Sequence, residues 1–128
     1  MNFKYRQIVL DAADLEAEST FWASLLDGTV KGDDRWHNIW LDGGWALAIQ
    51  HAPNHIPPDW PDGTPQQQIH LDFYTADLES AHKKVLELGG RVLRARDHAS
   101  AHRGVRIYAD PAGHPFCICW LPPSDPEQ

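Results

Sequence analysis

Chemically active side chains occupy alternate positions in two apolar segments of the chain. His70, Asp72 and Tyr74 alternate with apolar residues in one segment, and Cys117 and Cys119 do so in the other. Residues two apart on a strand share a face, so each set is expected to point one way. Histidine titrates near neutral pH, and Asp72 on the same face could orient it, which makes His70 the candidate general base or metal ligand.

A structural role is the competing interpretation for each of these residues. His70 also fits a hydrogen-bonded structural histidine. Cys117 and Cys119 could be nucleophiles, but no cationic neighbour is identified, and small buried hydrophobic residues are the preferred interpretation. Their Cα atoms would lie about 6.5 Å apart on a strand, so we expect no mutual disulfide, and reduced thiols fit a cytoplasmic protein.

The elements that must position these residues come from an internal repeat. The segment from Gln7 to Glu16 is echoed by the segment from His70 to Glu79, and both contain Ala-Asp-Leu-Glu. Asp14 and Asp77 suit helix N-caps, because a carboxylate can accept from the free amides of the first turn. Apolar residues then recur at helical spacing, up to Gly28 in the first half and to the Gly89-Gly90 pair in the second.

Alternating apolar residues predict four strands in each half. In the first half they cover approximately 7–11, 30–32, 36–41 and 45–51, and in the second 69–74, 91–96, 104–109 and 115–121. The predicted class is α+β: one domain of two βαβββ modules, whose strands form a curved eight-stranded sheet around a central cup. The modules span about 3–51 and 67–122, with a proline-rich linker at 52–66 and a tail at 123–128.

Strand parity predicts which side chains line this cup. Ile8, Leu10, Ile69, Leu71 and Phe73 should pack under the helices, which leaves the alternate residues to face the cup. The predicted lining is Gln7, Val9, Ala48, Gln50, His70, Asp72, Tyr74, Cys117 and Cys119. Trp36 is expected at its mouth.

The segment from Asp97 to Gly104 is polar and has two interpretations. It could be a lid whose Arg103 or Arg106 meets an anionic substrate, or it could be a solvated loop.

Charge and hydropathy exclude two classes of partner. The net charge is −7, with 18 acidic and 11 basic residues, whereas nucleic-acid binding needs a basic face. No segment approaches the roughly 20 apolar residues that cross a bilayer, and the start lacks a charged leader followed by an apolar segment. We expect neither nucleic acid nor membrane as a partner, and a cytoplasmic location.

Together, the repeat and the turn Asp110-Pro-Ala-Gly-His before the last strand carry a family resemblance. The chain resembles, over nearly its whole length, the glyoxalase/bleomycin resistance/dioxygenase (vicinal oxygen chelate) superfamily. The resemblance implies metal ligands from a His or Gln in each module's first strand and a Glu in each last strand. Gln7 and His70 match the first-strand positions, whereas Ala48 and Cys117 stand where the two Glu residues would be.

The missing carboxylates leave the cofactor open. Mg²⁺ and Mn²⁺ want several oxygen donors, which this set lacks. Gln7, His70 and Cys117 could hold Zn²⁺, which accepts nitrogen and sulfur, but a pocket without metal is the preferred interpretation.

Three functions follow as hypotheses. The first is a bleomycin resistance-like homodimer that binds a small aromatic or apolar molecule, as the resemblance implies. The alternative is a metal-dependent lyase, isomerase or dioxygenase with His70 and Gln7 as ligands. The third is a module that binds a protein through its sheet edges.

Overall fold

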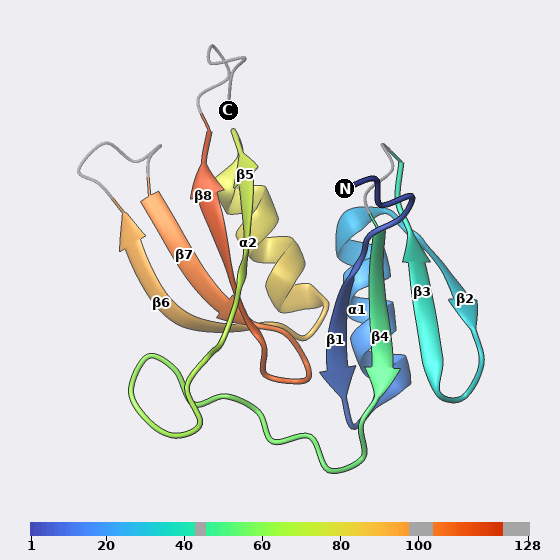
Figure 1. The fold of residues 1–128 in the computed structure, drawn as a ribbon. Coiled ribbons are helices and arrows are strands. Elements are labelled where there is room, and N and C mark those ends of the chain that lie inside the picture. The colour runs from blue at the N-terminus through green and yellow to red at the C-terminus, as the bar shows by residue number, and fades with distance from the viewer. Residues whose placement is uncertain (43–45, 98–103, 122–128) are drawn as a thin grey trace. The chain divides into compact units, whose positions relative to one another are not determined.

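The computed structural model describes the chain except residues 43–45, 98–103 and 122–128. It divides into two compact units, Met1–Ile56 and Pro57–Gln128. Each unit contains one sheet and one helix (Figure 1). We call them module 1 and module 2.

Module 1 is a four-stranded sheet covered on one face by a helix. Its elements are β1 (Ile8–Ala12), α1 (Leu15–Leu26), β2 (Thr29–Gly32), β3 (Trp36–Trp40) and β4 (Ala46–His51). The strand order is β1-β4-β3-β2; β1 pairs with β4 in parallel, and the other pairs are antiparallel.

Module 2 repeats this topology. Its elements are β5 (Leu71–Thr75), α2 (Leu78–Glu87), β6 (Arg91–Asp97), β7 (Gly104–Ala109) and β8 (Pro115–Trp120), in the sheet order β5-β8-β7-β6. The predicted α+β fold of two βαβββ modules is confirmed, and within the described residues the strands pair as two four-stranded sheets.

Both predicted N-caps are present. The Asp14 Oδ1 accepts a hydrogen bond from the Ala17 amide at 3.0 Å, and the Asp77 Oδ1 accepts one from the Ser80 amide at 3.0 Å. The Ser80 hydroxyl also donates to Asp77 at 2.7 Å, and these two hydrogen bonds lower the pKa of the Asp77 carboxyl. The identical aspartates therefore start two equivalent helices.

Burial agrees with the predicted faces in β1, whereas in β8 the successive residues from Pro115 to Ile118 are all buried and burial does not separate the faces. Leu10 and Ala12 of β1 are buried, and Val9 is exposed. In module 2, Phe116 and Ile118 are buried, and the Phe116 ring packs against Tyr108 at 5.5 Å and Phe73 at 6.3 Å between centroids. The prediction for Ile69 was wrong: its side chain is 67% exposed, because β5 begins only at Leu71.

The Asp110-Pro-Ala-Gly turn fixes the entry to β8. The Asp110 carboxylate accepts from the His114 amide at 2.8 Å, and the backbones of these two residues are also hydrogen-bonded. Gly113 has a φ of +91°, and a Cβ there would lie 2.6 Å from Pro57. A side chain at this position is therefore excluded by both conformation and space.

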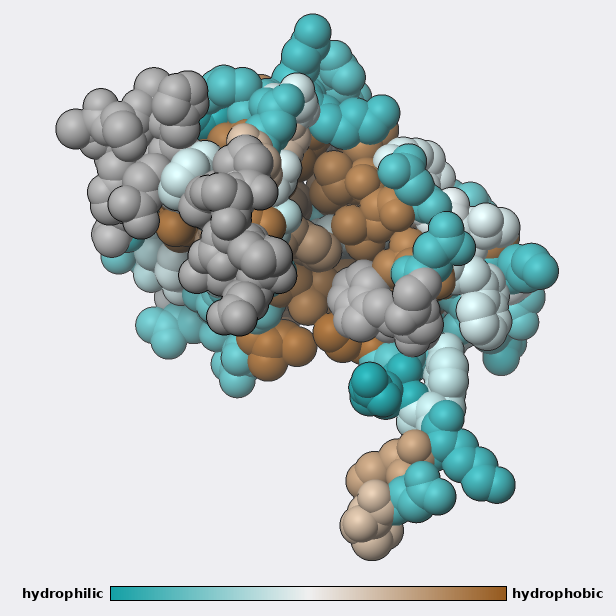
Figure 2. Space-filling model, turned by 90° about the horizontal axis from the view of Figure 1, so that it is seen from above, coloured by the Kyte–Doolittle hydropathy of each residue, from teal (hydrophilic) through white to brown (hydrophobic). Residues whose placement is uncertain are grey.

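Apolar side chains also reach the surface of the molecule. Figure 2 shows hydrophobic residues exposed among hydrophilic ones. Those with large exposed fractions include Trp40 at 50% in module 1 and Tyr74 at 53% in module 2. In the part of the chain that the structure describes, no helix is long and apolar enough to span a membrane.

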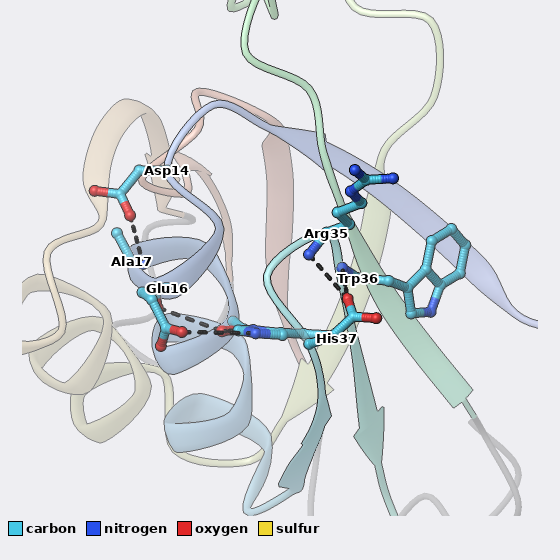
Figure 3. A network of polar contacts seen from close by, with 8 residues as sticks. Asp14, Glu16, Ala17, Arg35, Trp36 and His37 are labelled. Atoms are coloured by element: carbon cyan, nitrogen blue, oxygen red, sulfur yellow. Dashed lines mark hydrogen bonds and ion pairs between the residues drawn. The ribbon is translucent and has the colours of Figure 1, made fainter.

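The glutamate of Ala-Asp-Leu-Glu contacts a buried basic side chain of the sheet in both modules. In module 1, the Glu16 carboxylate lies 3.6 Å from Nε2 of the buried His37 on β3, whose Nδ1 lies 2.8 Å from the Ser19 hydroxyl (Figure 3). In module 2, Glu79 accepts from the buried Arg106 on β7 at 2.6 Å.

The two basic side chains, His37 and Arg106, occupy equivalent positions in the repeat. His37 pairs with Ile49 and Arg106 with Ile118, the matching residues of the last strands. The hypothesis that Arg106 meets a substrate was wrong, because its guanidinium lies under α2 and is bonded to Glu79.

Candidate functional site

The predicted chemical residues of module 2 come together on one face of its sheet. β5 and β8 are neighbours, with Asp72 opposite Cys117 and Tyr74 opposite Cys119. Residues in register on adjacent strands share a face, here the one opposite to the buried Phe116 and Ile118. His70 directly precedes β5 and contacts Asp72 from the same side. We call His70, Asp72 and Cys117 the module 2 cluster.

The module 2 cluster is compact and open to solvent at its polar end. The His70 Nε2 lies 3.2 Å from the Asp72 Oδ1, and the two side chains are 41% and 43% exposed. One donor atom from each of His70, Asp72 and Cys117 falls within 4.8 Å of the other two. Cys117 is buried, so the thiol forms the floor beneath an accessible imidazole and carboxylate.

The surroundings keep the thiols protonated. Burial raises the pKa of Cys117 to about 12, with the hydrogen bond to Asp72 and its negative charge adding to the effect. Burial and the charge of Asp72 also raise the pKa of Cys119. The pKa of Tyr74 is raised by Cys119 and then Asp72. At neutral pH the free cluster therefore offers a neutral thiol donor rather than a nucleophilic thiolate.

Module 1 places uncharged residues at the equivalent positions. Val9 pairs with Ala48 in the way that Asp72 pairs with Cys117, which confirms the alignment of the two last strands. Ala48 is fully buried, and Gln50 is exposed. Gln7 is half-buried just before β1, and its amide oxygen accepts from the Tyr5 hydroxyl at 3.0 Å.

Trp36 belongs to the same face of module 1. It pairs with Gln50 across β3 and β4 and is half-buried. Its indole N–H donates to the Asn38 side-chain oxygen at 2.8 Å, so Asn38 is a polar residue on this face that the sequence prediction missed. Its parity with Trp36 on β3 could have found it.

One predicted arginine is not described by the structure, and another arginine lies at the site without having been predicted. Arg103 lies outside the described residues. Arg94 was not predicted at the site, although it shares the face of the module 2 cluster, because a shift of register in β6 between Val92 and Arg94 changes the alternation. Such a bulge leaves no reliable signal in the sequence.

The fold and the site define a class of protein: two βαβββ modules, with a polar cluster on the sheet face that the helix of module 2 does not cover, which we call the open face. Residues 7–119 match the model of the glyoxalase-like domain family. The chain therefore belongs to the glyoxalase-like domain family. None of the curated proteins matches it.

Solved structures share this fold at low sequence identity. The fosfomycin resistance protein FosX from Listeria monocytogenes is 13% identical with a TM-score of 0.70, and the match covers 94% of this chain and 95% of that one. A glyoxalase family protein from Enterococcus faecalis is 20% identical with a TM-score of 0.66, over 93% and 99%. A glyoxalase/bleomycin resistance protein/dioxygenase family enzyme from Burkholderia phytofirmans is 12% identical with a TM-score of 0.67, over 90% and 96%. At these identities the likeness shows the fold.

Proposed function

We propose that the chain binds a small molecule with an aromatic or apolar body on the open face of the module 2 sheet. One observation carries this proposal: a half-exposed His70–Asp72 pair lies beside the Tyr74 ring and above the buried Cys117 thiol. The predicted contacts outside this group stay part of the proposal, namely Gln7, Val9, Trp36, Ala48, Gln50, Cys119 and Arg103.

The chemistry of this face suits recognition. Small-molecule sites combine apolar area with a few polar groups that fix orientation. Tyr74 offers an exposed ring for stacking, and the buried Cys117 offers an apolar floor. The imidazole and carboxylate at the edge provide donors and acceptors that a bound molecule can reach.

A neutral aromatic dye tests the proposal directly. Phenylnaphthylamine, which fluoresces in apolar surroundings, is titrated into the protein and into Tyr74→Ala. Loss of the stacking ring is expected to weaken binding about fivefold. Leu86→Ala removes an exposed apolar side chain from α2 and serves as the matched control, with no expected change. Equal binding by the protein and both variants, or no binding by any of them, would overturn the proposal.

A metal-dependent lyase, isomerase or dioxygenase is the second candidate, favoured by the donor set of the module 2 cluster. His70, Asp72 and Cys117 present one nitrogen, one oxygen and one sulfur within 4.8 Å of one another. This mixture fits Zn²⁺ and does not fit Mg²⁺, which prefers oxygen ligands only. A bound Zn²⁺ would supply a Lewis acid that polarises a substrate oxygen, as a lyase or isomerase needs; it has no redox chemistry, so a dioxygenase would need a redox-active metal at this site. Gln7 remains a predicted further ligand.

Metal content separates the two candidates. Protein purified without chelator is expected to carry about one equivalent of zinc if the second candidate holds, and Zn²⁺ should raise the melting temperature of chelator-treated protein. Cys117→Ser and His70→Ala should lose both effects. Cys119→Ser, which changes the neighbouring thiol outside the module 2 cluster, should keep them. Less than about a tenth of an equivalent of any transition metal, with no thermal shift on adding Zn²⁺, would exclude the metal enzyme.

Assembly and compartment belong to the same proposal. We expect a homodimer, supported by exposed apolar side chains such as Trp40, and a cytoplasmic location, supported by two free cysteines. Light scattering of the eluted protein measures the first, and a concentration-independent monomer would contradict it.

A further inference from the structure

A single row of side chains crosses all four strands of module 2. The register places Asp72 on β5 opposite Cys117 on β8, Cys117 opposite Ile107 on β7, and Ile107 opposite Arg94 on β6. Residues in register share a face, so these four lie side by side on the open face of the sheet. The row therefore begins with a carboxylate, continues over two apolar positions and ends with a guanidinium.

Arg94 is the cation of this row, and its side chain is half-buried. Among the residues that the structure describes, no carboxylate forms an ion pair with its guanidinium. Arg106 differs, because its guanidinium is buried under α2 and bonded to Glu79 at 2.6 Å. A partly desolvated guanidinium keeps five donors that favour a charged acceptor, so Arg94 is available to an acceptor from outside the chain.

We propose that Arg94 binds the anionic group of the ligand, a carboxylate, phosphate or sulfonate, while the apolar body lies over Ile107 and Cys117. This inference rests on the proposed binding function. Planar guanidinium groups bind such oxyanions through two parallel hydrogen bonds. The ligand class is therefore an amphipathic anion with its charge at one end.

The opposite end of the row sets the direction of the ligand. Strands lie about 4.8 Å apart, so the backbones at Arg94 and Asp72, three strands apart, are separated by roughly 14 Å. The Asp72 carboxylate repels a second negative charge near β5. A neutral or hydrogen-bonding group is expected beside the His70–Asp72 pair.

Two dyes of the same aromatic framework isolate the role of Arg94. Anilinonaphthalene sulfonate carries a sulfonate that phenylnaphthylamine lacks. Arg94→Gln should weaken binding of the sulfonate dye about tenfold and change binding of the neutral dye by less than about twofold. Arg94→Lys keeps the charge but loses the two parallel donors of the guanidinium, so it should weaken binding of the sulfonate dye by an intermediate amount. Lys83→Gln removes the same charge from the exposed side of α2 and should change neither dye.

The outcomes distinguish this inference from the function on which it rests. If Tyr74→Ala weakens both dyes but Arg94→Gln weakens neither, or weakens both equally, the Arg94 site is overturned and the binding face remains. If Tyr74→Ala changes neither dye, the binding face itself is overturned. Circular dichroism of each variant confirms that the β6 substitutions fold, and an unfolded Arg94→Gln leaves Arg94→Lys to decide between these results.

Discussion

Module 1 and module 2 share a backbone plan, but they differ on the open face, including the three positions that form the module 2 cluster. Gln7, Val9 and Ala48 of module 1 stand where module 2 has the cluster of His70, Asp72 and Cys117. Each ionisable group of the cluster is thus matched by an uncharged side chain in the other copy. The duplicated scaffold holds the strands in both modules, while the candidate chemistry belongs to one.

The helices also differ, but here module 1 has the more extensive feature, because α1 buries more apolar side chain than α2. α1 buries large aromatic side chains, Phe21 and Trp22, which are both 1% exposed. α2 buries only Leu78 and Val85, and Lys84 is exposed where α1 has Phe21. Burial of apolar area is the main stabilising contribution to folding, so module 1 gains more from its helix. The module with the candidate site is therefore the one with the weaker helix packing.

Truncating the equivalent buried helix residues should show this difference most strongly. Trp22 and Val85 occupy matching helix positions, and both are almost fully buried. Trp22→Ala should lower the free energy of unfolding by about 3–5 kcal/mol, and Val85→Ala by about 2 kcal/mol. Urea denaturation followed by circular dichroism measures both. A larger loss for Val85→Ala would reverse the proposed division between the modules.

Local sequence signals were sufficient for the scaffold. Ala-Asp-Leu-Glu marked both helix starts because capping needs only a carboxylate near the first-turn amides. Alternation placed Asp72, Tyr74 and both cysteines on one face because strand side chains have a period of two residues. These rules act over a few residues, so one sequence contains them.

Features that depend on strand pairing were not predictable. The shift of register in β6 puts Arg94 on the open face of the sheet. Regular alternation from Arg91 would place Arg94 on the face that α2 covers. Arg106 remained a possible substrate contact in the lid hypothesis because its hydrogen bond to Glu79 joins residues 27 positions apart. Neither the bulge nor the ion pair has a local signal, and both decide which arginine can meet a ligand.

The Glu16 and Glu79 contacts provide a second comparison of the modules. Glu79→Ala leaves the buried Arg106 without this acceptor and should cost about 1–3 kcal/mol. Glu16→Ala should cost less than about 1 kcal/mol, because its contact to His37 is 3.6 Å long and Glu16 is 83% exposed.

Glu79→Gln, which keeps an oxygen acceptor for Arg106, is the matched control and should lose less than Glu79→Ala. Thermal and urea unfolding of the three variants gives the comparison. Equal losses for Glu16→Ala and Glu79→Ala would mean that the two contacts under the helices are energetically alike.

The last comparison concerns Asp72, whose equivalent in module 1 is the uncharged Val9. In chelator-treated Cys119→Ser protein, Cys117 should react with iodoacetamide at neutral pH at least about tenfold more slowly than a free cysteine, because its pKa is raised to about 12. The reaction should accelerate as the pH rises toward that value, since only the thiolate attacks.

Asp72→Asn removes the negative charge beside Cys117 and should increase the neutral-pH alkylation rate several-fold, which corresponds to roughly 1 kcal/mol. Burial, the larger cause, persists in this variant, so Cys117 should stay slower than a free thiol. Mass spectrometry of the alkylated peptide measures each rate, and an unchanged rate in Asp72→Asn would show that burial alone silences the thiol.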